Sequence, residues 1–271
     1  MSAIGTLVEL AKMDIDAEFE NILHYAEHPT TTLQATAPAR AFEELVRSRR
    51  SIRVFKPDVR VPEEAINAAL DLAMLAPNSS NLQPWEFHWV RTPEKKAELV
   101  RLCMSQPPAR TASDLIVFVA RTRTWRRNCN AIRSVLEADP TTPRGALTYY
   151  RLAVPLMYTQ AANLLSAVKH VLFNLQGFTK PMPREPNFEW GMQMWATKSV
   201  CLAASIFMLA IRSRGYDSCP MEGCDQRRIK SLLRLPRDAR VCMVIAVGER
   251  ADKGIYGKRV RLDRSWFVKE V

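Results

Sequence analysis

The residues best suited to chemistry lie in three short polar stretches. The first, SRRSIRVF, brings Arg49, Arg50, Ser51 and Arg53 within five residues. A guanidinium donates paired hydrogen bonds from a rigid planar fork, so a cluster of them is suited to bind a phosphate. The basic stretch GKRVRLDR, at 257–264, can either converge on the same phosphate or form a solvated surface.

The second stretch is PNSSNLQPW, at 77–85, which follows an expected helix over 62–76 and precedes an expected strand over 85–90. A bare connection needs only about two to six residues. This loop instead offers amides and hydroxyls that could hold a polyol or a heterocycle. The alternative is a loop whose side chains satisfy only their own backbone, with Trp85 returning to the core.

The third stretch, GYDSCPMEGCD at 215–225, reads as a turn between a buried helix and the next helix. Glycine lets the backbone approach a ligand closely, so Gly223 could bring backbone N–H groups against a flat molecule. None of the three stretches contains a nucleophile with a paired base. Their chemistry is therefore expected to be binding and orientation.

In this order, the three stretches resemble the FMN-dependent nitroreductase family, in which RRSxRxF, a PSSxNxQPW-like loop and a P-x-E-G-[FC]-D turn recur. The similarity extends from about residue 41 to the closing KRVRLDRSWFVKEV. It implies an α+β sandwich, with a central and mostly antiparallel sheet flanked by helices. It also implies an intertwined homodimer with FMN at the subunit interface and ping-pong electron transfer from NAD(P)H.

The resemblance assigns roles to single positions. Arg49 and Ser51 match positions that hold the FMN phosphate, Arg50 lies beside them, and Arg53 matches a cation near the flavin N1–C2 carbonyl. The remaining matches are Pro77, Asn78, Ser79 and Asn81 in a loop that reaches the FMN from the partner subunit, Pro220, Met221, Glu222 and Gly223 along the isoalloxazine, and Arg259 and Arg261 as a second cationic pair on the phosphate. No side chain is expected to be catalytic in its own right, because the flavin carries the redox step and Arg53 tunes it.

Three features depart from the family pattern. The usual Lys before the expected 114–121 strand is absent, with Arg110 the only cation nearby in the sequence, and Cys224 stands where Phe is common. The region 125–190 is longer than in compact members. Within it, 145–178 is helical by pattern, with a kink expected at Pro155. This segment carries more apolar surface than one helix face needs. It can thicken the dimer interface, or it can cover the flavin as a lid in which Tyr149 and Tyr150 contact the substrate.

The expected function is electron transfer from NAD(P)H through FMN to a small-molecule acceptor, such as a nitroaromatic or a quinone. The alternative is another flavin reaction on the same scaffold: dehalogenation, flavin fragmentation or dehydrogenation of a biosynthetic intermediate. The resemblance leaves open the physiological substrate and the preferred nicotinamide.

Composition narrows the class of protein. The chain has 271 residues and a formal net charge of +11, but its Lys and Arg fall in separate places, which disfavours a nucleic-acid partner. The sequence contains no run of 18 uninterrupted apolar residues, so no membrane-spanning helix is expected. Six cysteines lack metal-binding spacing, and Pro29 ends the helix that His24 and His28 would share, so no metal site is expected. The thiols are expected to be reduced in a cytoplasmic protein.

The helices and strands that must position these stretches are predicted from the spacing of apolar residues and from the turn residues between them. Residues 1–40 are expected to form a helical extension (about 4–27) and a linker, and 41–271 a single domain with a helical insert at about 125–190. Further helices are expected over 41–48, 62–76, 93–103, 192–215 and 225–235, and strands over 85–90, 114–121 and 241–249. The continuous apolar runs of the last two strands predict burial on both faces.

Overall fold

The computed structural model describes residues 37–159 and 188–271, together with residues 170, 171, 173–175, 177–179, 181 and 186. The expected helix over about 4–27 and most of the linker after it lie outside the described residues. The first described helix, α3 (Ala37–Ser48), begins at Ala37, inside the expected linker. Much of the expected 145–178 helix also lies outside them.

A four-stranded antiparallel sheet forms the centre of the described chain, in the order β1-β2-β4-β3. Its strands are β1 (Trp85–Val90), β2 (Asp114–Arg121), β3 (Asp217–Met221) and β4 (Ala239–Gly248). The ladder between β2 and β4 shifts register between Phe118 and Val119, which is a β-bulge. The expected α+β class with a mostly antiparallel sheet is confirmed.

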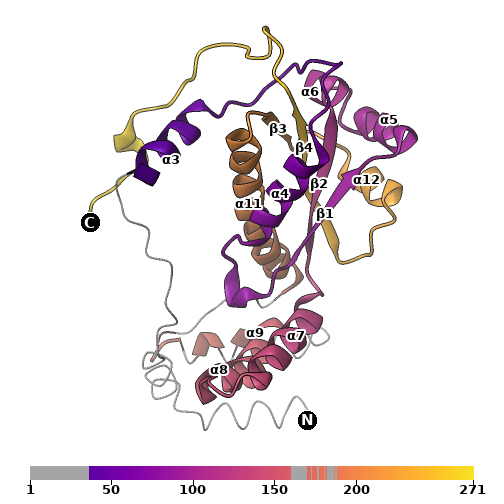
Figure 1. The fold of residues 1–271 in the computed structure, drawn as a ribbon. Coiled ribbons are helices and arrows are strands. Elements are labelled where there is room, and N and C mark those ends of the chain that lie inside the picture. Colours follow the sequence, from indigo (N-terminus) through magenta and orange to yellow (C-terminus); the bar gives the residue numbers. More distant parts are fainter. Residues whose placement is uncertain are drawn as a thin grey trace.

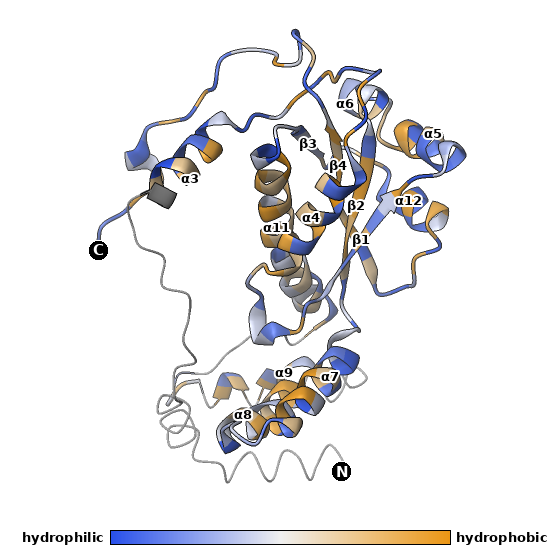
Figure 2. Ribbon diagram, viewed as in Figure 1, coloured by the Kyte–Doolittle hydropathy of each residue, from blue (hydrophilic) through white to orange (hydrophobic). Residues whose placement is uncertain are grey.

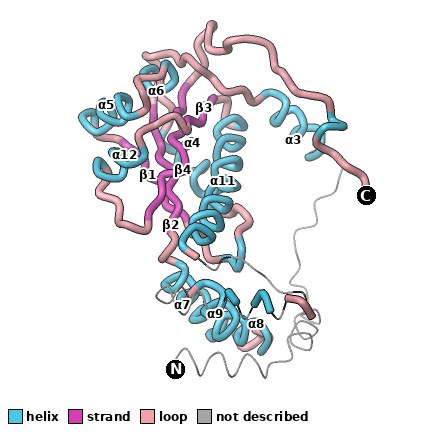
Figure 3. Tube along the Cα trace, turned by 180° about the vertical axis from the view of Figure 1, so that it is seen from behind, coloured by secondary structure: helices cyan, strands magenta, loops and turns pink. Residues whose placement is uncertain are grey.

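Helices cover both faces of this sheet (Figure 1). One face carries α4 (Glu63–Met74) and α11 (Glu189–Ser213). The other carries α5 (Pro93–Leu102), α6 (Pro107–Thr111) and α12 (Gln226–Leu232). Seen from behind in Figure 3, the strands lie between these two helical layers.

The side chains of the central strands alternate between two cores, as a period of two requires. On β2, Ile116 and Phe118 pack under α4 and α11. Leu115 and Val117 pack on the opposite face, under α5 and α12. Figure 2 shows the apolar residues concentrated on the central strands and α11. Each large apolar side chain that is fully buried contributes about 1.5–3 kcal/mol to folding, so this two-sided core holds the sheet rigidly.

Helix α11 is the one helix of the described chain whose length and apolar composition would allow it to cross a membrane. Half of its most apolar window (50%) is buried within the protein, where Ala203 and Phe207 pack against the sheet. It ends at Ser213, and Gly215, two residues later, has a φ of 84° that lets Tyr216 N–H reach the carbonyl of Ile211 at 3.2 Å. α11 is therefore the central core helix that the sequence predicts.

The segment after β2 forms a group of short helices beyond the end of the sheet (Figure 1). It contains α7 (Trp125–Ala138), α8 (Arg144–Thr148), the π-turn η2 (Tyr149–Ala153) and α9 (Val154–Tyr158). Pro155 cannot donate a helical hydrogen bond, and the widened turn directly precedes it, which agrees with the expected kink. The expected helix over 145–178 is not continuous, because α9 ends at Tyr158.

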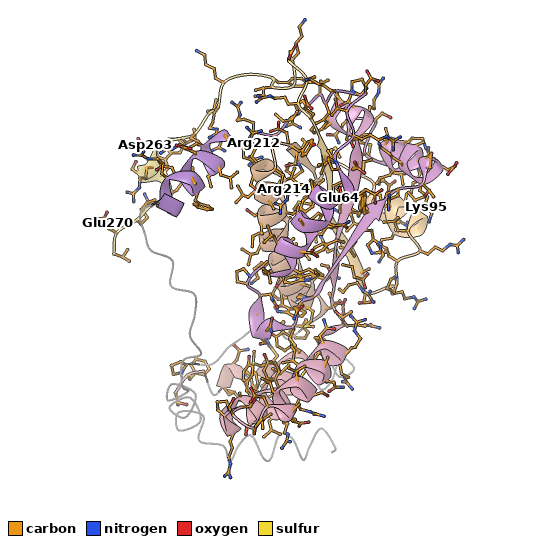
Figure 4. All side chains as sticks on the ribbon, in the orientation of Figure 1. Glu64, Lys95, Arg212, Arg214, Asp263 and Glu270 are labelled. Carbon is orange, nitrogen blue, oxygen red and sulfur yellow. The ribbon has the colours of Figure 1, made fainter. Side chains whose placement is uncertain are left out.

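The two ends of the described chain lie together, away from α7–α9 (Figure 1). Helix α3 meets the end of α11, where Arg212 Nε donates to Ser48 Oγ at 3.1 Å and Arg212 Nη1 pairs with Asp217 at 3.2 Å. Figure 4 shows Arg212 on this side of α11 and Asp263 on the C-terminal tail next to α3. The tail, 249–271, contains one short turn, η3 (Arg264–Trp266).

Candidate functional site

A cavity of ≈ 320 Å³ lies between the basic stretch after α3 and the C-terminal tail. Its described lining residues include five arginines and a lysine and no carboxylate. They are Arg49, Arg50, Ser51, Arg53, Ile255, Tyr256, Gly257, Lys258, Arg259, Val260 and Arg261. The two basic clusters at opposite ends of the domain therefore converge on one place.

Two buried apolar side chains and their backbone hydrogen bonds position the first cluster. Ile52 and Phe55 are fully buried, and Ile52 N–H donates to the carbonyl of Ser218 on β3 at 3.2 Å. Arg53 N–H donates to the carbonyl of Gly254 at 2.7 Å. A Cβ on Gly254 would lie 2.7 Å from the carbonyl oxygen of Val54, so only glycine allows this approach. With its apolar members anchored in the core, the stretch leaves its arginines at the cavity.

Two hydrogen bonds cross the cavity and join the two clusters. Arg50 Nη2 donates to the carbonyl of Gly257 at 2.7 Å, and Arg259 Nη2 donates to the carbonyl of Arg49 at 2.6 Å. Backbone carbonyls neutralise guanidinium charge only in part, because they are dipoles. The cluster therefore keeps its excess positive charge.

Arg49 lies in an environment that disfavours its positive charge. Burial lowers the pKa of its guanidinium, and the nearby charges of Arg259 and Arg261 lower it further. Its Nη1 is buried and has no hydrogen-bond partner in the described part of the chain. A buried charged donor without an acceptor is costly. A dianionic group in the cavity would offset the repulsion among these arginines.

Next to this cavity, β3 leads into the segment 220–223. Arg53 Nη1 lies 3.7 Å from Cys219 Sγ, which brings its guanidinium to the last residue before Pro220. Gly223 accepts a hydrogen bond from Gln106 Nε2 at 2.7 Å, and its backbone is outside the left-handed region. The fold itself does not demand glycine here, because a Cβ would meet only the flexible Gln106 amide, at 3.3 Å.

The loop 77–83 has an unusual backbone. Ser80, Asn81 and Gln83 have positive φ values of 56°, 49° and 47°, a conformation that costs free energy in non-glycine residues. Asn78 satisfies backbone groups within the loop, since its Oδ1 accepts from Gln83 N–H at 2.7 Å and its Nδ2 donates to the Ala76 carbonyl at 3.1 Å. For Asn78, the structure thus shows the self-satisfying contacts that the sequence allowed as an alternative.

Three tyrosine hydroxyls from the η2–α9 segment hold this loop. Tyr149 Oη lies 2.6 Å from Ser80 Oγ, and Tyr150 Oη donates to the Ser80 carbonyl at 3.1 Å. Tyr158 Oη lies 2.9 Å from Ser79 Oγ and 3.1 Å from Ser80 Oγ. Burial raises the pKa of Tyr149, and raises that of Tyr150 to about 12, so both are neutral hydrogen-bonding groups at physiological pH.

Sequence reasoning missed this contact between the loop and the helical segment. Tyr158 is almost fully buried at 1% exposure, and a buried tyrosine hydroxyl needs a polar partner. That requirement was the available signal, but it does not say which loop supplies the partner. Tyr149 and Tyr150 contact the loop, and the substrate role that the lid hypothesis gives them stays a prediction.

Lys96 is a second residue that the sequence did not place. Its Nζ donates to the carbonyls of Ala112 and Ser113, at 2.9 and 2.6 Å, directly before β2. Burial lowers the pKa of this ammonium. A lysine from α5 therefore stands near the position where the sequence offered only Arg110.

A single chain does not bring all the predicted site residues together. In Figure 1, the loop before β1 lies at the end of the sheet near α9, and the segments that line the arginine cavity lie at the opposite end. Residues 49–53, 219–223 and 255–261 form one group, and the 77–83 loop forms another.

Comparison with known proteins adds three observations. The sequence model of the Nitroreductase family matches residues 46–249. YdgI of Bacillus subtilis, whose name assigns it provisionally to the NAD(P)H nitroreductases, is 28% identical over 225 residues, which cover 82% of this chain and 94% of YdgI. Two solved structures, both described provisionally as nitroreductases, share the fold. YdfN of Bacillus subtilis has a TM-score of 0.68, 21% identity and coverage of 86% of this chain and 100% of that one. A protein of Exiguobacterium sibiricum in complex with FMN has a TM-score of 0.60, 24% identity and coverage of 89% and 100%.

Proposed function

The chain belongs to the nitroreductase family, and from this we propose that it is an FMN-dependent oxidoreductase that passes electrons from NAD(P)H to a nitroaromatic, quinone or similar small-molecule acceptor. The arginine cavity is the observation that carries the proposal. Its five arginines, and the absence of a carboxylate among its described lining residues, fit a phosphate monoester.

The residues present fit FMN in their chemistry. Arg49, Arg259 and Arg261 would hold the phosphate, with Arg50 fixing the tail through Gly257. When bound, FMN supplies the hydride and electron transfer. Arg53 stands beside β3 and would place a fixed positive charge near the ring, where it favours the negatively charged reduced form.

The segment 220–223 would lie along the ring. Pro220 and Met221 belong to β3, and Met221 is buried, so this part is held rigidly by the sheet. Glu222 and Gly223 follow at the surface. A rigid backbone offers its N–H groups at fixed positions, which orients a planar ligand without a loss of side-chain entropy. Glu222 would act only through its backbone.

We also propose that the site is completed by a second copy of the chain. The α3 helix and the tail expose large apolar side chains, with Phe42 60% exposed and Trp266 and Phe267 67% each. α11 exposes Trp190 and Leu202 in the same way, at 54% and 48%. Extended apolar surface of this kind favours association. A twofold dimer would let the loop 77–81 of one protomer meet the arginine cavity of its partner.

The free state of all six cysteines supports a reducing, cytoplasmic location for this enzyme. The alternative reactions on this scaffold are dehalogenation, flavin fragmentation and dehydrogenation of a biosynthetic intermediate. They differ from the proposed reaction in the acceptor or in the fate of the flavin, so measuring turnover with a panel of acceptors distinguishes them.

The test is to purify the protein and measure bound flavin, oligomeric state and turnover. We expect a yellow dimer whose flavin is released as FMN and is reduced by NADH or NADPH, with multiple turnover on a panel of nitroaromatics and quinones. A flavin-free monomer would contradict the proposal. Flavin that is reduced but not reoxidised by any acceptor of the panel would favour one of the alternative reactions.

A further inference from the structure

The loop between α5 and α6 has a costly backbone and leads to Gln106, the residue directly before α6. Met104 and Ser105, two consecutive residues other than glycine, have positive φ values of 57° and 48°. Their N–H groups donate back to the end of α5, to the carbonyls of Arg101 at 3.1 Å and Val100 at 3.0 Å. Backbone of this kind persists only where its surroundings determine it, and it is concentrated at functional sites. The loop thus gives Gln106 a definite position.

The Gln106 side chain reaches the segment that follows β3, which lies 117 residues further along the sequence. α5, α6 and α12 share one face of the sheet, so the loop after α5 meets the turn before α12 (Figure 1). Gln106 Nε2 donates to the carbonyl of Gly223 at 2.7 Å and to the carbonyl of Cys103 at 3.0 Å. Because both neighbours are acceptors, only the NH₂ end of the amide can face them. Among the described residues, no other side chain donates to the backbone of 222–224.

The turn that this amide contacts is tight. Cys224 N–H donates to the carbonyl of Glu222 at 2.8 Å, which closes a turn around Gly223. Asp225 N–H donates to the carbonyl of Leu102 at 2.8 Å, at the end of α5. One backbone hydrogen bond and one side-chain hydrogen bond therefore tie the turn to the same end of α5.

Two backbone donors of this turn are left free. In the part of the chain that the structure describes, neither Glu222 N–H nor Gly223 N–H has an acceptor, and both residues are exposed. Because the Gly223 carbonyl is held, rotation about the backbone bonds of Gly223 is restricted, and with it the direction of its own N–H. Donors fixed in advance bind a ligand without a further cost for ordering them.

We propose that Gln106 is a positioning residue for the flavin: it holds the turn 222–224 so that the free N–H groups of Glu222 and Gly223 face the hydrogen-bond acceptors of the ring, the nitrogen N5 among them. The proposal rests on the proposed function, which places the segment 220–223 along the ring. Gln106 acts through this backbone and not on the reacting atoms. Its role gives a reason for the costly backbone of the loop before it.

The first test examines the turn without any flavin. Gln106→Met keeps the length of a partly exposed side chain and removes its donors, and Gln106→Glu places acceptor oxygens against two carbonyls. In the FMN-free protein, Cys224 N–H should exchange with deuterium about fivefold faster in Gln106→Met than in wild type, the factor that corresponds to one net hydrogen bond. Exchange should be faster still in Gln106→Glu. Ser105→Ala is the matched control, since it changes the neighbouring side chain, which makes no hydrogen bond, and it should exchange like wild type.

The second test measures the affinities for three flavins. In 5-deaza-FMN a C–H group replaces N5 and removes one acceptor of the ring, so wild type should bind FMN about fivefold more tightly than 5-deaza-FMN. Gln106→Met should lose most of this preference, whereas Ser105→Ala should keep it. Riboflavin should lose as much affinity as FMN in Gln106→Met, because the amide acts at the ring and not at the phosphate.

A preference for FMN over 5-deaza-FMN that survives Gln106→Met would overturn the proposal, as would wild-type exchange of Cys224 N–H in that variant. Equal binding of FMN and 5-deaza-FMN by wild type would also overturn it, because the free N–H groups would then not face N5. A failure of the proposed function would remove the flavin role altogether, and it would show differently, as a wild-type protein that binds none of the three flavins.

Discussion

The hydroxyl of Tyr149 lies 2.6 Å from the hydroxyl of Ser80, a residue with a positive φ of 56° in the loop before β1. With the contacts of Tyr150 and Tyr158, this bond fixes a costly backbone conformation from outside the loop. A strained loop persists only where its surroundings determine it. The helical insert therefore has a definite task, which is to hold the loop that the proposed function places against FMN.

Removing single tyrosine hydroxyls tests this task. Tyr149→Phe and Tyr158→Phe should each lower the free energy of unfolding by about 1 kcal/mol, the typical net value of one hydrogen bond. Each should also weaken FMN binding severalfold, because the loop loses its fixed geometry. Tyr216→Phe, a partly buried tyrosine beside the same core, is the control. FMN affinities equal to that of wild type, measured by fluorescence quenching, would show that the contact serves folding only.

The phosphate assignment is tested with two variants of the arginine cavity. Arg49→Ala and Arg261→Ala should each weaken FMN binding by roughly 1.5–3 kcal/mol, as expected for a charge-assisted bond. Riboflavin, which lacks the phosphate, should bind both variants and wild type equally. Arg264→Ala, on the exposed tail, is the control. If riboflavin loses as much affinity as FMN, the cavity does not hold the phosphate.

Arg53 is predicted to act on the redox equilibrium of the flavin. Arg53→Gln should retain FMN but lower its reduction potential, because the positive charge that favours the anionic reduced ring is gone. Spectroelectrochemical titration measures this change. Arg110→Gln removes an exposed arginine elsewhere and should leave the potential unaltered. A wild-type potential in Arg53→Gln would remove Arg53 from this role.

Gly223 and Gly248 provide a matched pair of variants that tests the segment 220–223, which the proposed function places along the flavin. Gly223→Ala should fold normally, since its Cβ meets only the flexible Gln106 amide, at 3.3 Å. It should nevertheless weaken FMN binding, because the ring must approach this backbone closely. Gly248→Ala should instead destabilise the fold, since its Cβ would lie 2.9 Å from the buried Phe55 ring. Thermal unfolding and FMN titration separate the two effects, and normal FMN affinity in Gly223→Ala would contradict the close approach.

A buried thiol is expected to make the free energy of unfolding depend on pH in the alkaline range. Burial raises the pKa of Cys103 from 9.0 to about 12. Above pH 9 the thiol ionises in the unfolded chain but stays protonated in the folded one, so the unfolded state binds fewer protons and stability falls as pH rises. Urea unfolding under reducing conditions at pH 8 and pH 10.5 should therefore show a smaller loss for Cys103→Ala than for wild type. An equal loss in both proteins would mean that the thiol titrates alike in the two states.

The sequence predicted the central strands well. β1 and β2 have the expected bounds, because apolar and β-branched runs of this length suit a sheet whatever surrounds them. β3 was missed and taken for a turn, since Gly215 and Pro220 are turn residues by type. Pairing with β4 overrides that preference. α7 (Trp125–Ala138) lies inside the helical insert expected at about 125–190, but its own bounds and the burial of Trp125, which is 6% exposed, were not predicted.

The residues of the candidate site also differed in how far the sequence predicted their positions. The motifs located the arginines, but the sequence left open whether the two clusters converge, and the structure places both at one cavity. The contacts of the tyrosines with the loop span 69 to 79 residues of sequence and depend on where α9 ends. No local pattern carries that information.

Pro220 has a further consequence through its place on β3. β3 is an edge strand, and its outer side already accepts one hydrogen bond, from Ile52 N–H to the Ser218 carbonyl. Two residues on, Pro220 has no N–H to offer on that side. An unprotected edge is a template on which another chain can add a strand and begin to aggregate. Proline at this position ends that possibility. The edge next to the segment that the proposed function places along the flavin is thereby protected against the addition of another strand.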